Sequence, residues 1–148
     1  MVILDIATTV CAGLLIGVEF SVSAFINPIL WQLDERAQSR TIGLFARKLG
    51  FVMPFWYSAT LLLLVAETVL RLHQAGAWLL GTASAIWIVV IVLTLLFLVP
   101  INNRMTRLEG SRFAEEARRE HRKWDSMHRA RVAALAIALV CLLGGVRG

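Results

Sequence analysis

Four long apolar segments, separated by polar and basic stretches, set the pattern of the chain. They run from about Ile6 to Trp31, Phe51 to Leu70, Ala77 to Ile101 and Trp124 to Val146. Each approaches or exceeds the roughly 20 apolar residues that a helix needs to cross a bilayer. The pattern predicts an all-α integral membrane protein with four transmembrane helices in a single domain, 1–148. Because its outer connections are short, we expect antiparallel neighbours in an up-down four-helix bundle.

The composition supports this interpretation. Of the 148 residues, 58% are hydrophobic, and the mean hydropathy of +0.72 exceeds that of an ordinary soluble domain. No basic residue precedes the first apolar segment. The segment is also longer than the roughly 7–15 apolar residues of a signal peptide, so we predict that it is retained as a helix.

The basic residues predict the orientation. They gather in the two long loops expected at 32–50 and 102–123, whereas the connection after the second helix holds only Arg71 and the C-terminal tail only Arg147. Positive residues favour the cytoplasmic side, so we expect both long loops in the cytoplasm and both termini outside, in a bacterial cell membrane. Contact with anionic lipid headgroups explains the net charge of +5, and no nucleic acid partner is expected.

The loop before the fourth apolar segment is highly charged and predicts a cytoplasmic amphipathic helix. Ser111, followed closely by Glu115 and Glu116, is typical of a capped helical start. Phe113 and Ala117 would rest on the headgroups.

Small residues and cysteines in the apolar segments leave alternatives open. Gly13 and Gly17 form a GxxxG pattern, which permits close helix approach either within the chain, the preferred interpretation, or in a homo-oligomer. Cys11 and Cys141 fall at similar depth, so a disulfide is one alternative and two buried free thiols, the commoner fate, the other.

Polar side chains within spanning helices are costly and need a reason. Glu19, Ser23 and Asn27 recur at a spacing of four, which places them along one stripe. Pro28 then predicts a kink or an end of the first helix, because proline removes a backbone donor. Glu67 precedes Arg71 by four residues and predicts a structural ion pair at the outer interface.

The start of the fourth apolar segment carries a second polar stripe, formed by Trp124, His128 and Arg131 at spacings of four and three, which His121 extends by one turn. Arg131 lies about two turns inside the helix, roughly 10 Å deep, where a long side chain reaches the headgroups with difficulty. Glu19 is therefore predicted as its counter-charge.

Asparagines of other segments are expected at the same membrane level. Asn102 and Asn103 follow Pro100 at the end of the third segment, as Asn27 adjoins Pro28 in the first. An antiparallel bundle brings these groups together. The sequence thus predicts a hydrophilic cavity that opens inward, with Glu19 at its floor and His128, Arg131 and the amides at its rim.

A metal site is the weaker interpretation of the same stretch. His121, Asp125 and His128 lie within two turns, but their spacings spread them over roughly 60° of the helix. No metal and no cofactor are therefore expected.

Three motifs carry a family resemblance: Asn27-Pro28, Pro100-x-Asn102 and Trp124-x-x-x-His128-x-x-Arg131. In this order they resemble the anthrone oxygenase-like family of four-helix membrane proteins. The resemblance extends over essentially the whole chain, in helix number, loop pattern and motif order.

The resemblance implies a monooxygenase of polyketide pathways that oxidises an anthrone to an anthraquinone with molecular oxygen, without metal or flavin. His128 would act as the base. Arg131, with Asn102 or Asn103, would stabilise the enolate oxygen. Trp124 would stack on the flat substrate, and a small hydrophobic aromatic substrate would also meet Asn27 and Glu19.

Two other functions remain open. One is a membrane binding or transport protein for an amphiphilic ligand, which would retain the ligand without consuming oxygen. The other is an accessory subunit that binds a larger complex through the GxxxG face and the basic loop.

Overall fold

The computed structural model describes residues 1–107 and 115–148, and every regular element in these ranges is helical. Four helices are long and apolar enough to cross a membrane: Val2–Leu30, Glu35–Leu70, Ala77–Met105 and Arg118–Gly145. Ser111 and Phe113 lie outside the described residues, as does the side chain of Ala117, whereas from Glu115 the predicted amphipathic segment is helical and continuous with the fourth span. The predicted all-α class and its four spanning helices are confirmed.

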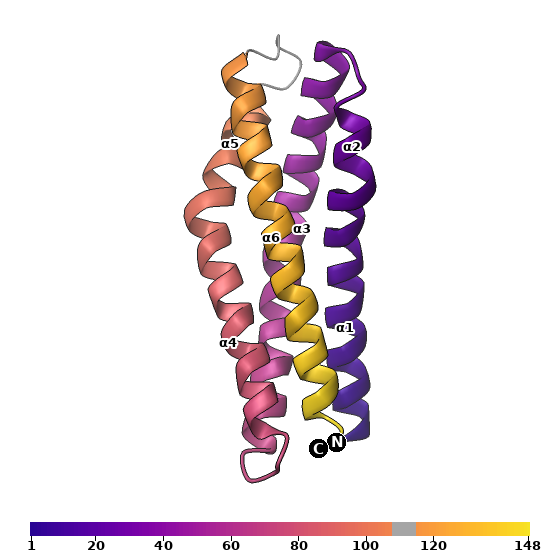
Figure 1. The fold of residues 1–148 in the computed structure, drawn as a ribbon, viewed down its shortest axis with the longest axis vertical. Coiled ribbons are helices and arrows are strands. Elements are labelled where there is room, and N and C mark those ends of the chain that lie inside the picture. Colours follow the sequence, from indigo (N-terminus) through magenta and orange to yellow (C-terminus); the bar gives the residue numbers. More distant parts are fainter. Residues whose placement is uncertain (108–114) are drawn as a thin grey trace.

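The four spans lie side by side as long rods, with both termini at one end (Figure 1). We call this the termini end, and the opposite end the loop end. The chain forms α1 (Val2–Ser21), η1 (Val22–Ile26), α2 (Asn27–Leu30), α3 (Glu35–Leu70), α4 (Ala77–Leu93), η2 (Thr94–Leu98), α5 (Val99–Arg107) and α6 (Glu115–Gly145). Successive rods run in opposite directions (Figure 1).

The second rod is longer than its apolar segment. α3 begins at Glu35 rather than near Phe51, so most of the stretch expected as a loop at 32–50 is helical. Asp34 caps this helix, since its side chain accepts hydrogen bonds from the backbone amides of Arg36 and Ala37. The extension therefore has a local start signal that hydropathy alone does not reveal.

Prolines in two rods follow π-helical turns. η1 ends two residues before Pro28, and η2 ends two residues before Pro100. A proline inside a helix lacks an amide donor and clashes with the carbonyl four residues earlier, and a π-turn relieves this conflict by widening the backbone. The first rod accordingly continues past Pro28 and ends at Leu30.

The main apolar core lies in the half of the bundle near the termini. All four rods contribute to it: Leu15 from α1, Leu64 from α3, Leu80 and Trp87 from α4, and Leu135 and Leu142 from α6. Trp87 donates its indole N–H to the Tyr57 carbonyl at 3.2 Å, which satisfies a polar group within this core.

The two glycines of the GxxxG pattern do not serve close packing within the chain. A Cβ added at Gly13 or Gly17 would meet no atom within 4 Å. The preferred interpretation of the GxxxG pattern as an intrachain contact is therefore wrong, and a contact between copies stays a prediction. Cys11 and Cys141 are both free thiols.

Candidate active site

A cavity of about 240 Å³ lies between the four rods, in the half of the bundle toward the loop end. Its walls come from α1, η1, α2, α3, α4, η2, α5 and α6, and most of the side chains that line it are apolar. The expected hydrophilic cavity is therefore wrong in character: most of its lining is apolar, and it contains one charged cluster.

The polar cluster is formed by Glu19, His128 and Arg131. The Arg131 Nη2 atom donates to the Glu19 Oε2 atom at 2.6 Å and approaches the His128 Nδ1 atom at 2.8 Å. Its Nη1 atom donates to the Thr94 hydroxyl at 3.2 Å. The side chains of Glu19 and His128 are almost fully buried, and that of Arg131 is only 11% exposed. The predicted ion pair between Glu19 and Arg131 is confirmed.

Tyr57 completes the cluster, and sequence reasoning missed it. Its hydroxyl donates to the Glu19 Oε1 atom at 3.0 Å, and the guanidinium of Arg131 lies 5.9 Å from the centre of its ring. Tyr57 is buried and lines the cavity. A lone tyrosine in an apolar helix looks like a core or interfacial residue, so no sequence signal identifies it.

The hydrogen bonds of His128 fix its neutral tautomer. The Nε2 atom lies 3.1 Å from the backbone carbonyl of Glu19, which can only accept, so Nε2 carries the proton. The Nδ1 atom then accepts from Arg131. Both ring nitrogens therefore contact protein groups, and His128 can take a proton from a ligand only after Arg131 releases Nδ1.

Three rings of α6 form a stack along one stripe. The imidazole of His128 lies 4.6 Å from the indole of Trp124 with 10° between the planes, and that of His121 lies 5.9 Å away at 8°. Trp124, His121 and His128 all line the cavity. Because the protein's own rings stack on Trp124, the indole has less free face for a substrate than the sequence predicted.

Asn27 connects the first rod to α6. Its side-chain amide donates to the Asp125 Oδ1 atom at 2.6 Å, and both residues are buried. Arg129 pairs with the other carboxylate oxygen of Asp125 at 2.8 Å. Asn27 lines the cavity, but its side-chain amide is already engaged by this hydrogen bond to a neighbouring rod.

The two asparagines of α5 differ in their position relative to the cavity. Asn102 lines the cavity, whereas Asn103 is exposed and does not line it, so its predicted place at the rim is wrong. Asn102 also lies eight residues beyond Thr94, the residue that binds Arg131, which is roughly 12 Å along a helix. Asn102 and Arg131 therefore reach the cavity at different levels.

No group of three or more histidine, cysteine, aspartate or glutamate side chains in the described ranges is arranged to hold a metal ion. Asp125, the carboxylate of the metal-like triad in the sequence, is engaged by Asn27 and Arg129.

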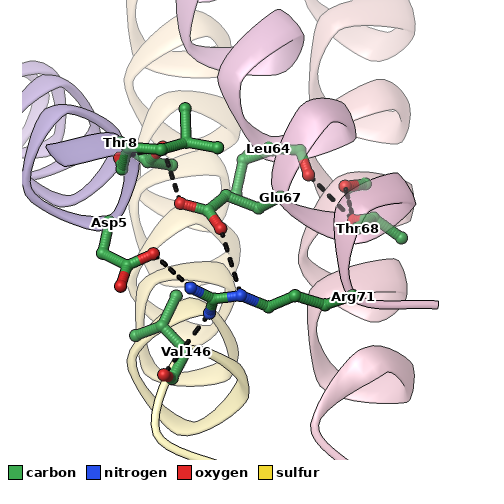
Figure 2. Close-up of polar contacts among 9 residues, drawn as sticks. Asp5, Thr8, Leu64, Glu67, Thr68, Arg71 and Val146 are labelled. Carbon is green, nitrogen blue, oxygen red and sulfur yellow. Dashed lines mark hydrogen bonds and ion pairs between the residues drawn. The ribbon is translucent and has the colours of Figure 1, made fainter. Parts of the chain in front are cut away.

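A second polar cluster lies at the termini end, away from the cavity. Arg71 donates to Asp5 and, at 3.4 Å, to the carbonyl of Val146, and its Nε atom lies 3.6 Å from Glu67 (Figure 2). Thr8 donates to the other oxygen of Glu67 at 3.3 Å. The predicted pair of Glu67 and Arg71 is confirmed, and it forms part of a larger cluster that joins both termini to α3.

Comparison with known families gives one match to the chain. Residues 43–141 match the family described as anthrone oxygenase. No curated protein and no solved structure matches the sequence. The matched range covers the cavity walls from α4, η2 and α5 and, apart from Ile42, that from α3, together with the stretch of α6 that holds Trp124, His128 and Arg131. On this match, which spans well over half of its residues, the chain belongs to the anthrone oxygenase family.

Proposed function

We propose that this protein is a membrane-embedded oxygenase that oxidises an anthrone-like aromatic with molecular oxygen. The family match supports an oxygenase-like role. The observation that carries the proposal is the cluster of Glu19, His128 and Arg131 on the wall of an apolar cavity. Ionisable groups within spanning segments are costly, and they commonly mark functional sites.

The chemistry needs a proton acceptor, a positive charge and a dry pocket. Loss of a methylene proton turns an anthrone into an electron-rich enolate, which reduces oxygen without a further electron donor. One oxygen atom then becomes the new carbonyl of the quinone and the other leaves as water. The electrons come from the two C–H bonds of the methylene group.

Arg131 is the group suited to the enolate oxygen. It is a nearly buried cation, held in place by Glu19 and Thr94, and charge stabilisation is strongest where water is excluded. A substrate oxygen that accepts from Arg131 would also draw the guanidinium away from the His128 Nδ1 atom. His128 would then be free to take the proton, with the Glu19 carboxylate 3.2 Å away to stabilise the imidazolium.

The test is oxygen uptake by the purified, metal-analysed protein with emodin anthrone as substrate. We expect the parent to consume one oxygen molecule per quinone formed. The rate of oxygen uptake by His128→Ala should be roughly 10²–10⁴-fold lower, because a general base usually contributes that much. His73→Ala is the matched control, because His73 is exposed in the turn between α3 and α4. Equal uptake by parent and His128→Ala would exclude the proposed base.

Binding or transport of an amphiphile is the second candidate. The observation that favours it is that both nitrogens of His128 already have protein partners, as expected of a structural histidine. Retention of emodin anthrone without oxygen uptake would support this function over oxidation.

A further inference from the structure

The walls of the cavity are unequally exposed. Among its lining residues, the exposed ones belong to α3 and η2 alone, whereas those from α1, α2 and α6 are buried or half-buried. Phe45 of α3 is one of these exposed residues. The other four are Gly50, Pro54 and Ser58, which share one face of α3 at a spacing of four, and Leu95 of η2; we call these four the lateral mouth.

The π-turn η2 explains why the wall is thin there. α3 packs closely on α4 and on α5 but makes little contact with η2, which lies between them. The rod bows outward between the labels α4 and α5 (Figure 1). Gly50 adds to the gap, because a Cβ at this position would meet no atom within 4 Å.

Toward the loop end, part of the cavity lining is a packed apolar cluster. Leu30, Ile42, Ile101 and Met105 form a buried apolar cluster there, with exposures of 3–6%, and three of them line the cavity. The expected inward opening stays a prediction. The lateral mouth opens on a surface where Phe51 and Phe55 of α3 and Leu96 of η2 are 62–71% exposed, as expected for side chains that face lipid.

We infer that the cavity takes its ligand sideways from the bilayer, through the lateral mouth between α3 and η2. The ligand class is a flat, uncharged, lipid-soluble aromatic with at least one carbonyl or phenolic oxygen, which the cavity directs to Arg131. Apolar walls suit the ring system, and the volume of about 240 Å³, below the roughly 300–1,000 Å³ of most ligand pockets, selects a compact molecule. The inference names the substrate class of the proposed oxygenase and so rests on it, although it is tested by binding alone.

The experiment uses the full chain in lipid nanodiscs, with emodin as the membrane-soluble probe and tryptophan emission as the readout. Gly50→Phe is designed to narrow the mouth, since a Cβ at this position would meet no atom within 4 Å. We expect it to slow association and dissociation of emodin by about tenfold each while the affinity changes little, because a mouth acts on rates more than on equilibrium. Gly50→Ala is the conservative variant and should behave like the parent.

Gly17→Phe is the matched control, since Gly17 is also an exposed helical glycine facing open space but does not line the cavity. Leu95→Phe narrows the mouth from the opposite side and replaces Gly50→Phe if that variant does not fold. Anthraquinone-2-sulfonate, which stays in water, distinguishes entry from the bilayer from entry from water. We expect that it does not associate with the protein.

Equal emodin kinetics in the parent, Gly50→Phe, Leu95→Phe and Gly17→Phe would overturn entry through this mouth. Rapid association of the sulfonate would overturn entry from the bilayer, and failure of emodin to bind the parent would overturn the ligand class. Slowed emodin binding without oxygen uptake from emodin anthrone would leave this inference standing and refute the oxygenase.

Discussion

Arg131 and Glu19 lie 112 positions apart in the chain, and their side chains meet at 2.6 Å on the wall of the cavity. The pair joins α6 to α1 across the centre of the bundle. Thr94, Tyr57 and His128 contact the same two side chains. One buried pair thus connects all four rods at the level of the proposed chemistry.

Loss of this cation should destabilise the fold as well as remove activity. Arg131→Met leaves the Glu19 carboxylate buried without its counter-charge, and we expect a loss of about 3–5 kcal/mol in the free energy of unfolding. Thermal unfolding in detergent measures it. Arg104→Met is the control, because its pair with Glu120 is exposed and should contribute only about 0–1 kcal/mol. Equal losses in the two variants would contradict a buried pair.

The cluster at the termini end should act independently of the cavity. Arg71→Met removes the partner of Asp5 and of the fully buried Glu67 (Figure 2). We expect a lower unfolding temperature, with a loss of about 3–5 kcal/mol, and unchanged affinity for emodin. Asp5→Asn should cost less, because its side chain is 25% exposed. A large change in emodin affinity with unchanged stability would contradict a purely structural cluster.

The hydrogen bond from Asn27 to Asp125 predicts a graded response. Asn27→Leu leaves a buried carboxylate oxygen without its donor and should cost about 1–3 kcal/mol. Asn27→Asp places a second carboxylate against Asp125 and should cost more at neutral pH. Chemical or thermal unfolding of both variants tests the order. A more stable Asn27→Asp variant would show that this contact is not formed.

The glycines should divide into two groups. A Cβ at Gly76 would lie 2.3 Å from the carbonyl oxygen of Gly145, a backbone atom that cannot move freely. Gly76→Ala should therefore destabilise the chain by about 1–3 kcal/mol, as overpacking does. A Cβ at Gly17 would face open space. Gly17→Ala should therefore leave the free energy of unfolding of the monomer unchanged or raise it by up to about 1 kcal/mol, because alanine favours a helix.

The same Gly17→Ala variant also tests the predicted contact between two copies of the chain. If the GxxxG face joins two chains, this substitution lowers the fraction of dimer in mild detergent, measured by light scattering. If the parent and Gly17→Ala have the same particle mass, the predicted contact between copies is wrong.

The sequence by itself determined the four spanning helices, because each apolar segment must satisfy its backbone hydrogen bonds internally to cross a bilayer. It also determined two ion pairs. Glu67 and Arg71 are one helical turn apart, and Glu19 and Arg131 are charges too deeply placed to remain unpaired.

Only the tertiary structure decided which neutral polar groups join these charges. Tyr57 reaches Glu19, and Asn27 reaches Asp125, because of how the rods are rotated about their axes. A one-residue change in rotation moves a side chain by about 100°, and hydropathy does not specify rotation that finely. Asn102 and Asn103 show the effect, since one lines the cavity and its neighbour is exposed.

The opening of the cavity was likewise beyond the sequence. Basic loops and amides predicted an inward mouth, whereas the exposed residues of the cavity lining lie on α3 and on the π-turn η2. A proline predicts some distortion of its helix. Which neighbouring rods the distorted turn lies beside depends on the arrangement of the rods, and that arrangement exists only in the folded chain.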